Sequence, residues 1–278
     1  MAVVATGFFD GVHLGHRQVV KALLQAARLR GEEAVVATFA QHPRAVLQQD
    51  PCALRLLSSG AEKVSLLEGL GVDRVEVLDF TREFASLSAR EYVREVLRDR
   101  FRASAVVLGY DNRFGSDSLR AEELVRLLGE EGMEVVRADE MPGISSTGIR
   151  RALSEGRIED ADAMLGYEYA LKGVVVPGKR LGRQIGFPTA NLGLCDPLKQ
   201  IPSRGVYATR TEVMGVSYAS MTNVGEIVET NIFDFDEDIY SLEIKVSFLR
   251  RVRDMMSFSS LDELRTRLAK DKEDVIGR

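Results

Sequence analysis

The chain has 278 residues, which at roughly 150 residues per domain predicts about two domains. Hydrophobic residues make up 45% and charged residues 28% of the chain, values that exclude a disordered or low-complexity protein. The net charge of -5 argues against a protein whose whole surface binds nucleic acid.

The chain shows no sign of export or membrane insertion. It has no apolar stretch of the roughly 18 residues that a membrane span requires, and its N-terminus lacks the basic segment of a signal peptide. The two cysteines, Cys52 and Cys195, lie far apart and form no CxxC motif. We therefore expect a reduced, cytoplasmic protein without a disulfide scaffold, zinc site, membrane partner or nucleic-acid partner.

The first half alternates strand and helix patterns. Short valine-rich runs predict strands at residues 3–7, 34–39, 74–80, 103–109 and 134–138. Helical periodicity separates them at residues 16–30, 62–70, 88–101 and 121–131. Strict alternation predicts a doubly wound parallel sheet of Rossmann-like type, which binds ligands at the carboxyl ends of its strands.

The second half changes to a β-rich pattern after Tyr167. Short helices are expected at 147–153 and 157–165, and strands at 169–176, 205–213, 216–223, 228–235 and 239–249. Met214 and Gly215 fit a hairpin turn, and a final helix is capped by Ser260 and Glu263. Adjacent strands with short connections predict an antiparallel β-barrel with a terminal helix. The expected domains are residues 1–155 and 168–278, joined by a helical linker at 156–167.

The loop after the first predicted strand has the composition of a phosphate site. Gly11 and Gly15 allow a tight turn and a close approach of the backbone to a ligand. The following helix N-terminus attracts anions, and His13 and His16 lie three residues apart in its first turn. The residues of this candidate phosphate site are Gly7, Phe8, Phe9, Asp10, Gly11, His13, Gly15 and His16.

The string G-x-F-D-G-V-H-x-G-H at residues 7–16 resembles the HxGH signature of nucleotidylyltransferases, in the form of bacterial FAD synthetases. Four further segments are similar to that family: 37–44, with Gln41 in place of the usual proline; 79–85, after the third predicted strand; 109–115; and I-S-S-T-G-I-R at 144–150. Two other departures are Asn112, where the family often has Phe, and Gly148, where it often has Arg.

The resemblance implies adenylyl transfer from ATP to FMN, with His13 and His16 contacting the ATP phosphates. Ser145, Ser146, Thr147 and Arg150 would hold the departing phosphates. Asn112 and Arg113 would lie near the nucleotide or the flavin phosphate. His42 is either a flavin contact or a local structural residue. Asp10 either helps to hold magnesium or orients the loop through hydrogen bonds.

A second glycine-rich loop lies in the β-rich half, at residues 178–191. Glycines recur every four residues among cations, a pattern suited to wrapping phosphate with backbone N–H groups. The attached G-F-P-T-A-N resembles the riboflavin kinase module that follows bacterial FAD synthetase domains. The resemblance implies that Thr189 and Asn191 hold Mg²⁺ and ATP. The phosphate-binding set is Gly178, Gly182, Arg183, Gly186, Phe187, Pro188, Thr189 and Asn191.

The same resemblance identifies a base and a flavin contact for the kinase. Residues 228–240 are similar to the family's segment that begins with a catalytic glutamate, here Glu229, which would accept the proton of the ribityl hydroxyl. Arg253 corresponds to a flavin-side residue. The chain departs from the family before Glu229, where a short loop containing Pro-Thr-Phe is deleted, and at Ser241, where glycine is usual.

These observations predict a bifunctional riboflavin kinase and FMN adenylyltransferase that uses Mg²⁺, with ATP as co-substrate and riboflavin, FMN and FAD as substrates and products. A monomer or weak oligomer is expected. One alternative is a monofunctional FAD synthetase with a degenerate, flavin-binding kinase domain. Others are a nucleotidylyltransferase for another phosphorylated acceptor and a non-enzymatic flavin- or nucleotide-binding regulator.

Overall fold

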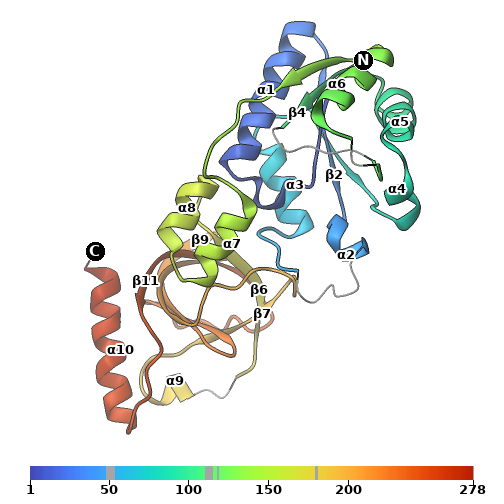
Figure 1. The fold of residues 1–278 in the computed structure, drawn as a ribbon. Coiled ribbons are helices and arrows are strands. Elements are labelled where there is room, and N and C mark those ends of the chain that lie inside the picture. Colours follow the sequence, from blue (N-terminus) through green and yellow to red (C-terminus); the bar gives the residue numbers. More distant parts are fainter. Residues whose placement is uncertain (48–53, 110–114, 118, 179–180, 278) are drawn as a thin grey trace. The chain divides into compact units, whose positions relative to one another are not determined.

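The computed structural model describes residues 1–47, 54–109, 115–117, 119–178 and 181–277. Two compact units make up the chain, Met1–Ser146 and Thr147–Arg278 (Figure 1). None of the helices in the described ranges is long and apolar enough to cross a membrane.

The first unit is built on a five-stranded parallel sheet with the strand order β3-β2-β1-β4-β5. The strands are β1 Ala2–Thr6, β2 Glu33–Phe39, β3 Arg74–Leu78, β4 Ala103–Leu108 and β5 Glu134–Arg137. All five predicted strands are therefore confirmed to within about two residues, the error expected at element ends. The chain reverses its winding direction at β1, so the loop after β1 lies at the switch point where such sheets bind ligands.

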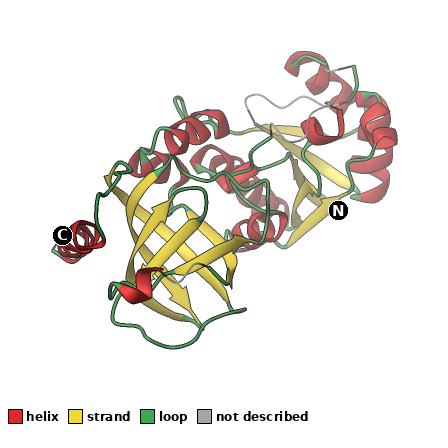
Figure 2. Cartoon of the chain, turned by 90° about the horizontal axis from the view of Figure 1, so that it is seen from below, coloured by secondary structure: helices red, strands yellow, loops and turns green. Residues whose placement is uncertain are grey.

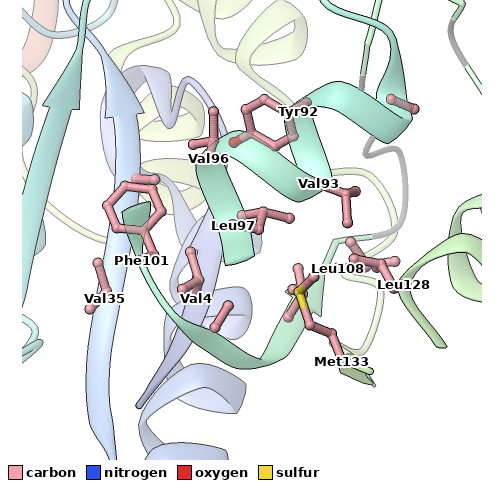
Figure 3. Packing of buried hydrophobic residues seen from close by; sticks show 14 of the residues in the cluster. Val4, Val35, Tyr92, Val93, Val96, Leu97, Phe101, Leu108, Leu128 and Met133 are labelled. Atoms are coloured by element: carbon pink, nitrogen blue, oxygen red, sulfur yellow. The ribbon is translucent and has the colours of Figure 1, made fainter. Parts of the chain in front are cut away.

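Helices cover both faces of this sheet. On one face, α1 (Leu14–Arg30) and α3 (Gly60–Glu68) share a buried apolar cluster with β1, β2 and β4. On the other face, the π-helix η3 (Tyr92–Arg100) and α6 (Ala121–Glu130) pack on the same strands. Figure 3 shows Tyr92, Val96 and Leu97 of η3 in one buried cluster with Val4 and Val35 of the sheet. The doubly wound prediction is confirmed.

The predicted helix over 88–101 is confirmed in position but differs in type. Ser88 caps the short helix α5 (Ala89–Glu91), and its capping box with Glu91 forms as predicted. The chain then widens into η3, whose last turn is closed by a hydrogen bond from the Phe101 N–H to the Val96 carbonyl. Two short helices were not predicted, α2 (Pro43–Leu47) and α4 (Arg82–Ser86), because five residues carry too little periodicity.

The second unit is a closed antiparallel barrel of six strands, in the order β10-β7-β6-β11-β8-β9 (Figure 2). Its strands are β6 Ala170–Val176, β7 Ala190–Leu194, β8 Gly205–Val213, β9 Val216–Val224, β10 Val228–Ile232 and β11 Glu243–Arg253. Its helices are α7 Ser146–Ser154, α8 Ile158–Leu165, α9 Leu181–Gln184 and α10 Leu261–Ile276. The predicted barrel and terminal helix are confirmed.

The barrel differs from prediction at a missed strand and at the ends of two others. Strand β7 was missed, because A-N-L-G-L is short and contains a polar residue and a glycine. The strands predicted at 228–235 and 239–249 are wrong at their facing ends. Asp234 (φ 56°) and Ser241 (φ 65°) adopt left-handed backbone conformations, which interrupt extended structure and leave residues 233–242 as a loop. The hairpin turn at Met214 and Gly215 is confirmed, with φ values of 48° and 80°.

Helices α7 and α8 pack with the barrel rather than linking it loosely. The Ser203 N–H donates to the Leu153 carbonyl at 2.9 Å, and Arg251 donates to the Glu155 carbonyl at 3.2 Å. Apolar side chains of both helices are fully buried, including Leu153 and Leu165. The predicted domain limits at 155 and 168 stay predictions, and a barrel unit that includes both helices is the arrangement that this packing favours.

Candidate active sites

The loop after β1 is a strained turn that presents two stacked imidazoles. It forms the short helix η1 (Asp10–Val12), in which Gly11 has φ 74°. Phe9 (φ 55°) and Val12 (φ 40°) are also left-handed, a conformation that is uncommon outside glycine and concentrates at functional sites. His13 caps α1, and its ring stacks on His16 with 3.7 Å between the ring centroids. The two predicted histidines therefore lie together at the helix N-terminus.

Hydrogen bonding and burial determine the protonation of this pair. Nδ1 of His13 accepts a hydrogen bond from the His16 N–H at 3.3 Å, which leaves the imidazole proton of a neutral His13 on Nε2. The pKa of His16 is well below its usual value, because of burial first and then the nearby charges of His13 and Lys63. His16 is therefore neutral at pH 7. Its Nδ1 is buried and has no hydrogen-bond partner among the described residues.

Asp10 orients the loop. Its buried carboxylate accepts hydrogen bonds from the N–H groups of Leu57, at 2.8 Å, and Ser58, at 3.2 Å. The Gly11 N–H in turn donates to Ser58 Oγ at 2.9 Å. Of the two roles open to Asp10 in the sequence, the structure supplies the contacts for loop orientation. These bonds tie the histidine turn to the segment that leads into α3.

The glycines predicted around the histidines leave space for neighbouring rings, and one of the two predicted serines forms a hydrogen bond with the turn. A Cβ at Gly15 would lie 3.3 Å from the His13 ring, and one at Gly7 would lie 3.3 Å from the Phe9 ring, so larger residues would crowd the turn. Ser146 Oγ donates to the Asp10 carbonyl at 3.2 Å, whereas Ser145 lies exposed just before α7.

For two groups of predicted residues, the structure gives no position relative to the histidine turn. Thr147 and Arg150 belong to the second unit, where their side chains approach within 3.5 Å, and their distance from the histidines stays a prediction. Asn112 and Arg113 lie outside the described residues.

Aromatic side chains and a buried lysine lie against the same turn. The ring of Phe8 contacts His42 edge-on, with 4.4 Å between centroids, and Nδ1 of His42 accepts from the Arg44 N–H at 3.0 Å. Lys63 of α3 places Nζ 3.8 Å from the centroid of the Phe8 ring. Sequence analysis missed Lys63, although one signal was available: it precedes Leu66 and Leu67 by three and four residues, on the apolar face of the helix.

In the second unit, the structure brings together three residues predicted for different roles. With its amide oriented so that both ends are satisfied, Asn191 donates to Glu229 Oε1 at 2.9 Å and accepts from the Gly178 N–H at 3.1 Å. Asn223 approaches the other carboxylate oxygen of Glu229 at 3.4 Å. Asn191 on β7 and Glu229 on β10 are directly paired across the ladder. The predicted base therefore has a defined position despite the shortened loop before it.

Glycine is required at the predicted positions of the phosphate loop. A Cβ at Gly178 would lie 1.6 Å from the side-chain amide of Asn191, and one at Gly182 would lie 2.2 Å from the Phe187 carbonyl oxygen. Gly186 has φ 82°, which other residues rarely adopt. Nδ2 of Asn231 donates to the Pro188 carbonyl at 2.6 Å and fixes the Pro-Thr segment to β10.

A cavity of about 380 Å³ opens between this segment and the loop that follows β10. Volumes of this size hold small-molecule ligands. Arg183, Pro188, Thr189 and Thr230 line the cavity on one side, and residues 235–240 line it on the other. The loop that sequence analysis expected to be part of two strands is thus a wall of the cavity.

Arg253 occupies a structural position. Its guanidinium pairs with Asp271 of α10 at 2.8 Å, and Asp271, which is fully buried, also binds Arg267. This cluster fastens α10 to β11. The flavin-side role of Arg253 stays a prediction.

Comparison with known proteins assigns the chain to a family. The FAD synthetase family model matches residues 1–150, and the riboflavin kinase family model matches residues 165–276. The chain belongs to the bifunctional riboflavin kinase/FMN adenylyltransferase family. The two matches cover the parallel-sheet unit and the barrel, in the order that the motifs predicted.

Curated members of the family resemble the chain along nearly all of its length. The bifunctional riboflavin kinase/FMN adenylyltransferase of Bacillus subtilis is 34% identical, over 99% of this chain and 92% of that protein. The Escherichia coli K12 protein of the same description is 33% identical, over 97% of this chain and 90% of that protein.

One solved structure is similar throughout. It is described as a macrolide-efflux protein from Streptococcus pneumoniae, with a TM-score of 0.91 and 36% identity over 100% of this chain and 94% of that chain. The similarity shows that both family units occur together in that fold. The efflux description applies to that protein, whereas both family models matched here name flavin enzymes.

Proposed function

We propose that the two units of this family member divide its two activities: the sheet unit makes FAD from FMN, and the barrel unit makes FMN from riboflavin. The observation that carries this proposal is the presence of two separate sites. One is a stacked pair of imidazoles at a helix N-terminus, and the other is a carboxylate held beside a glycine loop and a cavity.

In adenylyl transfer, a phosphate oxygen of FMN attacks the α-phosphorus of ATP, and the bond to the departing pyrophosphate breaks. Negative charge moves onto the pyrophosphate, and no covalent enzyme intermediate is needed. The N-terminus of α1, Nε2 of His13 and the neutral imidazole of His16 would donate hydrogen bonds to the phosphate oxygens as this charge develops. The hydrogen bonds of Asp10 keep the turn in place, so little reorganisation accompanies the reaction.

Ser145, Ser146, Thr147 and Arg150 would hold the departing phosphates, and His42, Asn112 and Arg113 would lie toward the acceptor. These assignments rest on the family resemblance. The contact of Ser146 with the Asp10 carbonyl supports the inclusion of the serine pair. Gly148, in place of the usual arginine, leaves one phosphate donor fewer than the family pattern.

In the kinase reaction, Glu229 would accept the proton of the ribityl 5′-hydroxyl as its oxygen attacks the γ-phosphorus of ATP, and ADP leaves. Hydrogen bonds from Asn191 and Asn223 aim the carboxylate, and the backbone of the glycine loop would receive the phosphates. The cavity of about 380 Å³ is the proposed nucleotide site.

Thr189 and Asn191 fit the magnesium ion that the family implies. They present a hydroxyl and an amide oxygen, hard donors that suit Mg²⁺, and the amide oxygen keeps a lone pair beyond its bond to Gly178. A magnesium ion held there would neutralise charge on the transferred phosphate. The cytoplasmic location and the monomeric or weakly oligomeric state are likewise predictions.

A chromatographic time course tests the proposal. Purified protein is incubated with Mg²⁺ and ATP, with riboflavin in one tube and FMN in another. We expect FMN and then FAD from riboflavin, and FAD directly from FMN. FAD from the FMN tube alone would support the monofunctional alternative, in which the barrel only binds flavin. No product in either tube would favour another phosphorylated acceptor or the non-enzymatic alternative.

A further inference from the structure

Lys63 is a buried cation beneath the histidine turn. Its residue exposure is 2%, although lysine is almost never fully buried without a partner. Nζ donates to the Phe39 carbonyl at the end of β2, at 2.8 Å, and lies 3.8 Å from the centroid of the Phe8 ring. Thr38 Oγ1 also donates to the Phe8 carbonyl, at 3.0 Å, so β2 holds Phe8 and Lys63 together.

Burying a lysine in this position costs desolvation free energy, which a residue that only fills space would not need to spend. No carboxylate forms an ion pair with Lys63 within the described residues, and Phe39 is the one hydrogen-bond acceptor that those residues offer it. An ammonium has three N–H donors, so the contacts leave part of its capacity unused. An apolar side chain of similar length would pack there without the desolvation cost of a charge.

The charge lies where the reaction accumulates negative charge. Nζ is at the carboxyl ends of β1 and β2, the edge at which a parallel sheet receives its ligand. The groups that act on it electrostatically are Asp10, which favours its charged form, and His16, whose own pKa Lys63 helps to lower. A charge in a buried site acts on nearby groups far more strongly than one in water.

We propose that Lys63 is a positioning residue for adenylyl transfer, whose buried positive charge beside Phe8 and the end of β2 favours the polyphosphate in the turn above it. It acts through Phe8, Asp10 and His16 and does not itself touch the reacting atoms. This role deepens the proposed function of the sheet unit and rests on it.

The charge state of Lys63 has a measurable consequence. Burial lowers the pKa of Lys63 to about 8. The ammonium is therefore mostly present at pH 7 and is lost as the pH rises through about 8. The phosphate groups of the substrates titrate near pH 6 instead. FAD formation by the unaltered protein should consequently decline above pH 8. Titration of the substrate phosphates does not produce this decline, because it is complete at lower pH.

The test compares Lys63→Met with Lys21→Met, which removes the same charge from an exposed position on α1. Rates of FAD formation from FMN and of FMN formation from riboflavin are measured across pH 5.5–9.5, beside the thermal midpoint of each protein. We expect Lys63→Met to lower kcat for FAD formation about tenfold to a hundredfold, less than removal of a direct donor. Lys21→Met and the kinase activity should be unchanged.

The pH profile separates positioning from a structural role. In Lys63→Met the decline above pH 8 should disappear, and the acid limb should move to higher pH, because His16 loses a neighbouring charge that depresses its pKa. A folded variant whose rate and pH profile both match the unaltered protein would overturn the proposal. So would a variant that is slower at every pH by the same factor.

Two further outcomes separate failure of this proposal from failure of the variant to fold and from failure of the proposed function. If Lys63→Met does not fold, the profile of the unaltered protein decides, and the absence of a decline near pH 8 overturns the proposal. If the unaltered protein makes no FAD from FMN, the proposed function of the sheet unit fails first, and the role of Lys63 falls with it.

Discussion

The two candidate sites differ in how they hold their functional groups. In the sheet unit, Asp10, His13 and Lys63 are all less than 7% exposed, and burial dominates the protonation of His16. In the barrel, Glu229 is half-buried and Thr189 is exposed, and hydrogen bonds from Asn191 and Asn223 aim the carboxylate. The first site is built to provide a fixed electrostatic environment. The second is built around close backbone packing beside a half-buried carboxylate, that of Glu229.

The largest expected effect comes from two variants, one in each site, with both activities measured for each variant. His16→Ala removes a donor from the buried site and should lower FAD formation by about 10²–10³-fold while sparing FMN formation. Glu229→Ala removes the proposed base and should lower FMN formation by about 10²–10⁴-fold while sparing FAD formation from added FMN. Separate rate measurements with FMN and riboflavin check both. Equal loss of the two activities in a folded protein would refute the division of labour.

The second test concerns space in the glycine loop. Gly178→Ala would drive a methyl into Asn191, 1.6 Å away, and displace the contact that aims Glu229. Kinase turnover should fall by about 10²-fold, because small misplacements at a reacting centre are that costly. Gly225→Ala is the matched control, since its added methyl meets nothing closer than 3.7 Å. Equal turnover in the two variants would show that close packing of Gly178 against Asn191 does not position Glu229.

The third test asks what Arg253 does. Asp271→Asn removes a fully buried carboxylate that pairs with Arg253 and Arg267, and should lower the free energy of unfolding by about 3 kcal/mol. Asp274→Asn makes the same charge change on an exposed part of α10 and should have little effect. Denaturant unfolding measures the difference, and riboflavin binding by the folded variant measures the flavin-side role. Unchanged stability would contradict the anchoring of α10.

The smallest expected effect is the pH dependence of stability from His16. The pKa of this residue is lowered in the folded state, so below pH 6.5 the unfolded chain takes up a proton that the folded chain resists. Its contribution is complete above pH 6.5 and is lost on acidification, by at most about 1.4 kcal/mol per pH unit. His16→Asn should flatten the unfolding free energy between pH 6.5 and 5. An unchanged slope would show that His16 is exposed or already charged.

Much of the fold follows from local pattern. Valine-rich runs and helical stripes identified all five strands of the parallel sheet, and the Ser88 and Ser260 caps lie where the spacing predicted them. The errors fall where pattern is weak. β7 is short and broken by glycine, and β10 ends at Ile232 because the chain turns at Asp234, a bend that apolar content alone does not reveal.

In the candidate sites too, residues close together in the chain were predicted and contacts between distant residues were not. The two histidines were identifiable because they share one turn of chain, and the phosphate-loop glycines because their spacing recurs. Lys63 was missed because its partner, Phe39, lies 24 residues away, and the anchoring of Asp10 spans 47 residues. The pairing of Arg253 with Asp271 spans 18 residues and joins a strand to a helix.

The sequence by itself determined the order of the two units, the fold class of each and the motifs that mark their chemistry, because these depend on periodicity and on residues close together in the chain. Only the tertiary structure decided which groups are buried, which amide aims Glu229 and where the buried ammonium of Lys63 lies. Burial and hydrogen bonding are properties of packed surfaces, and packing brings together residues whose separation in the chain carries no signal.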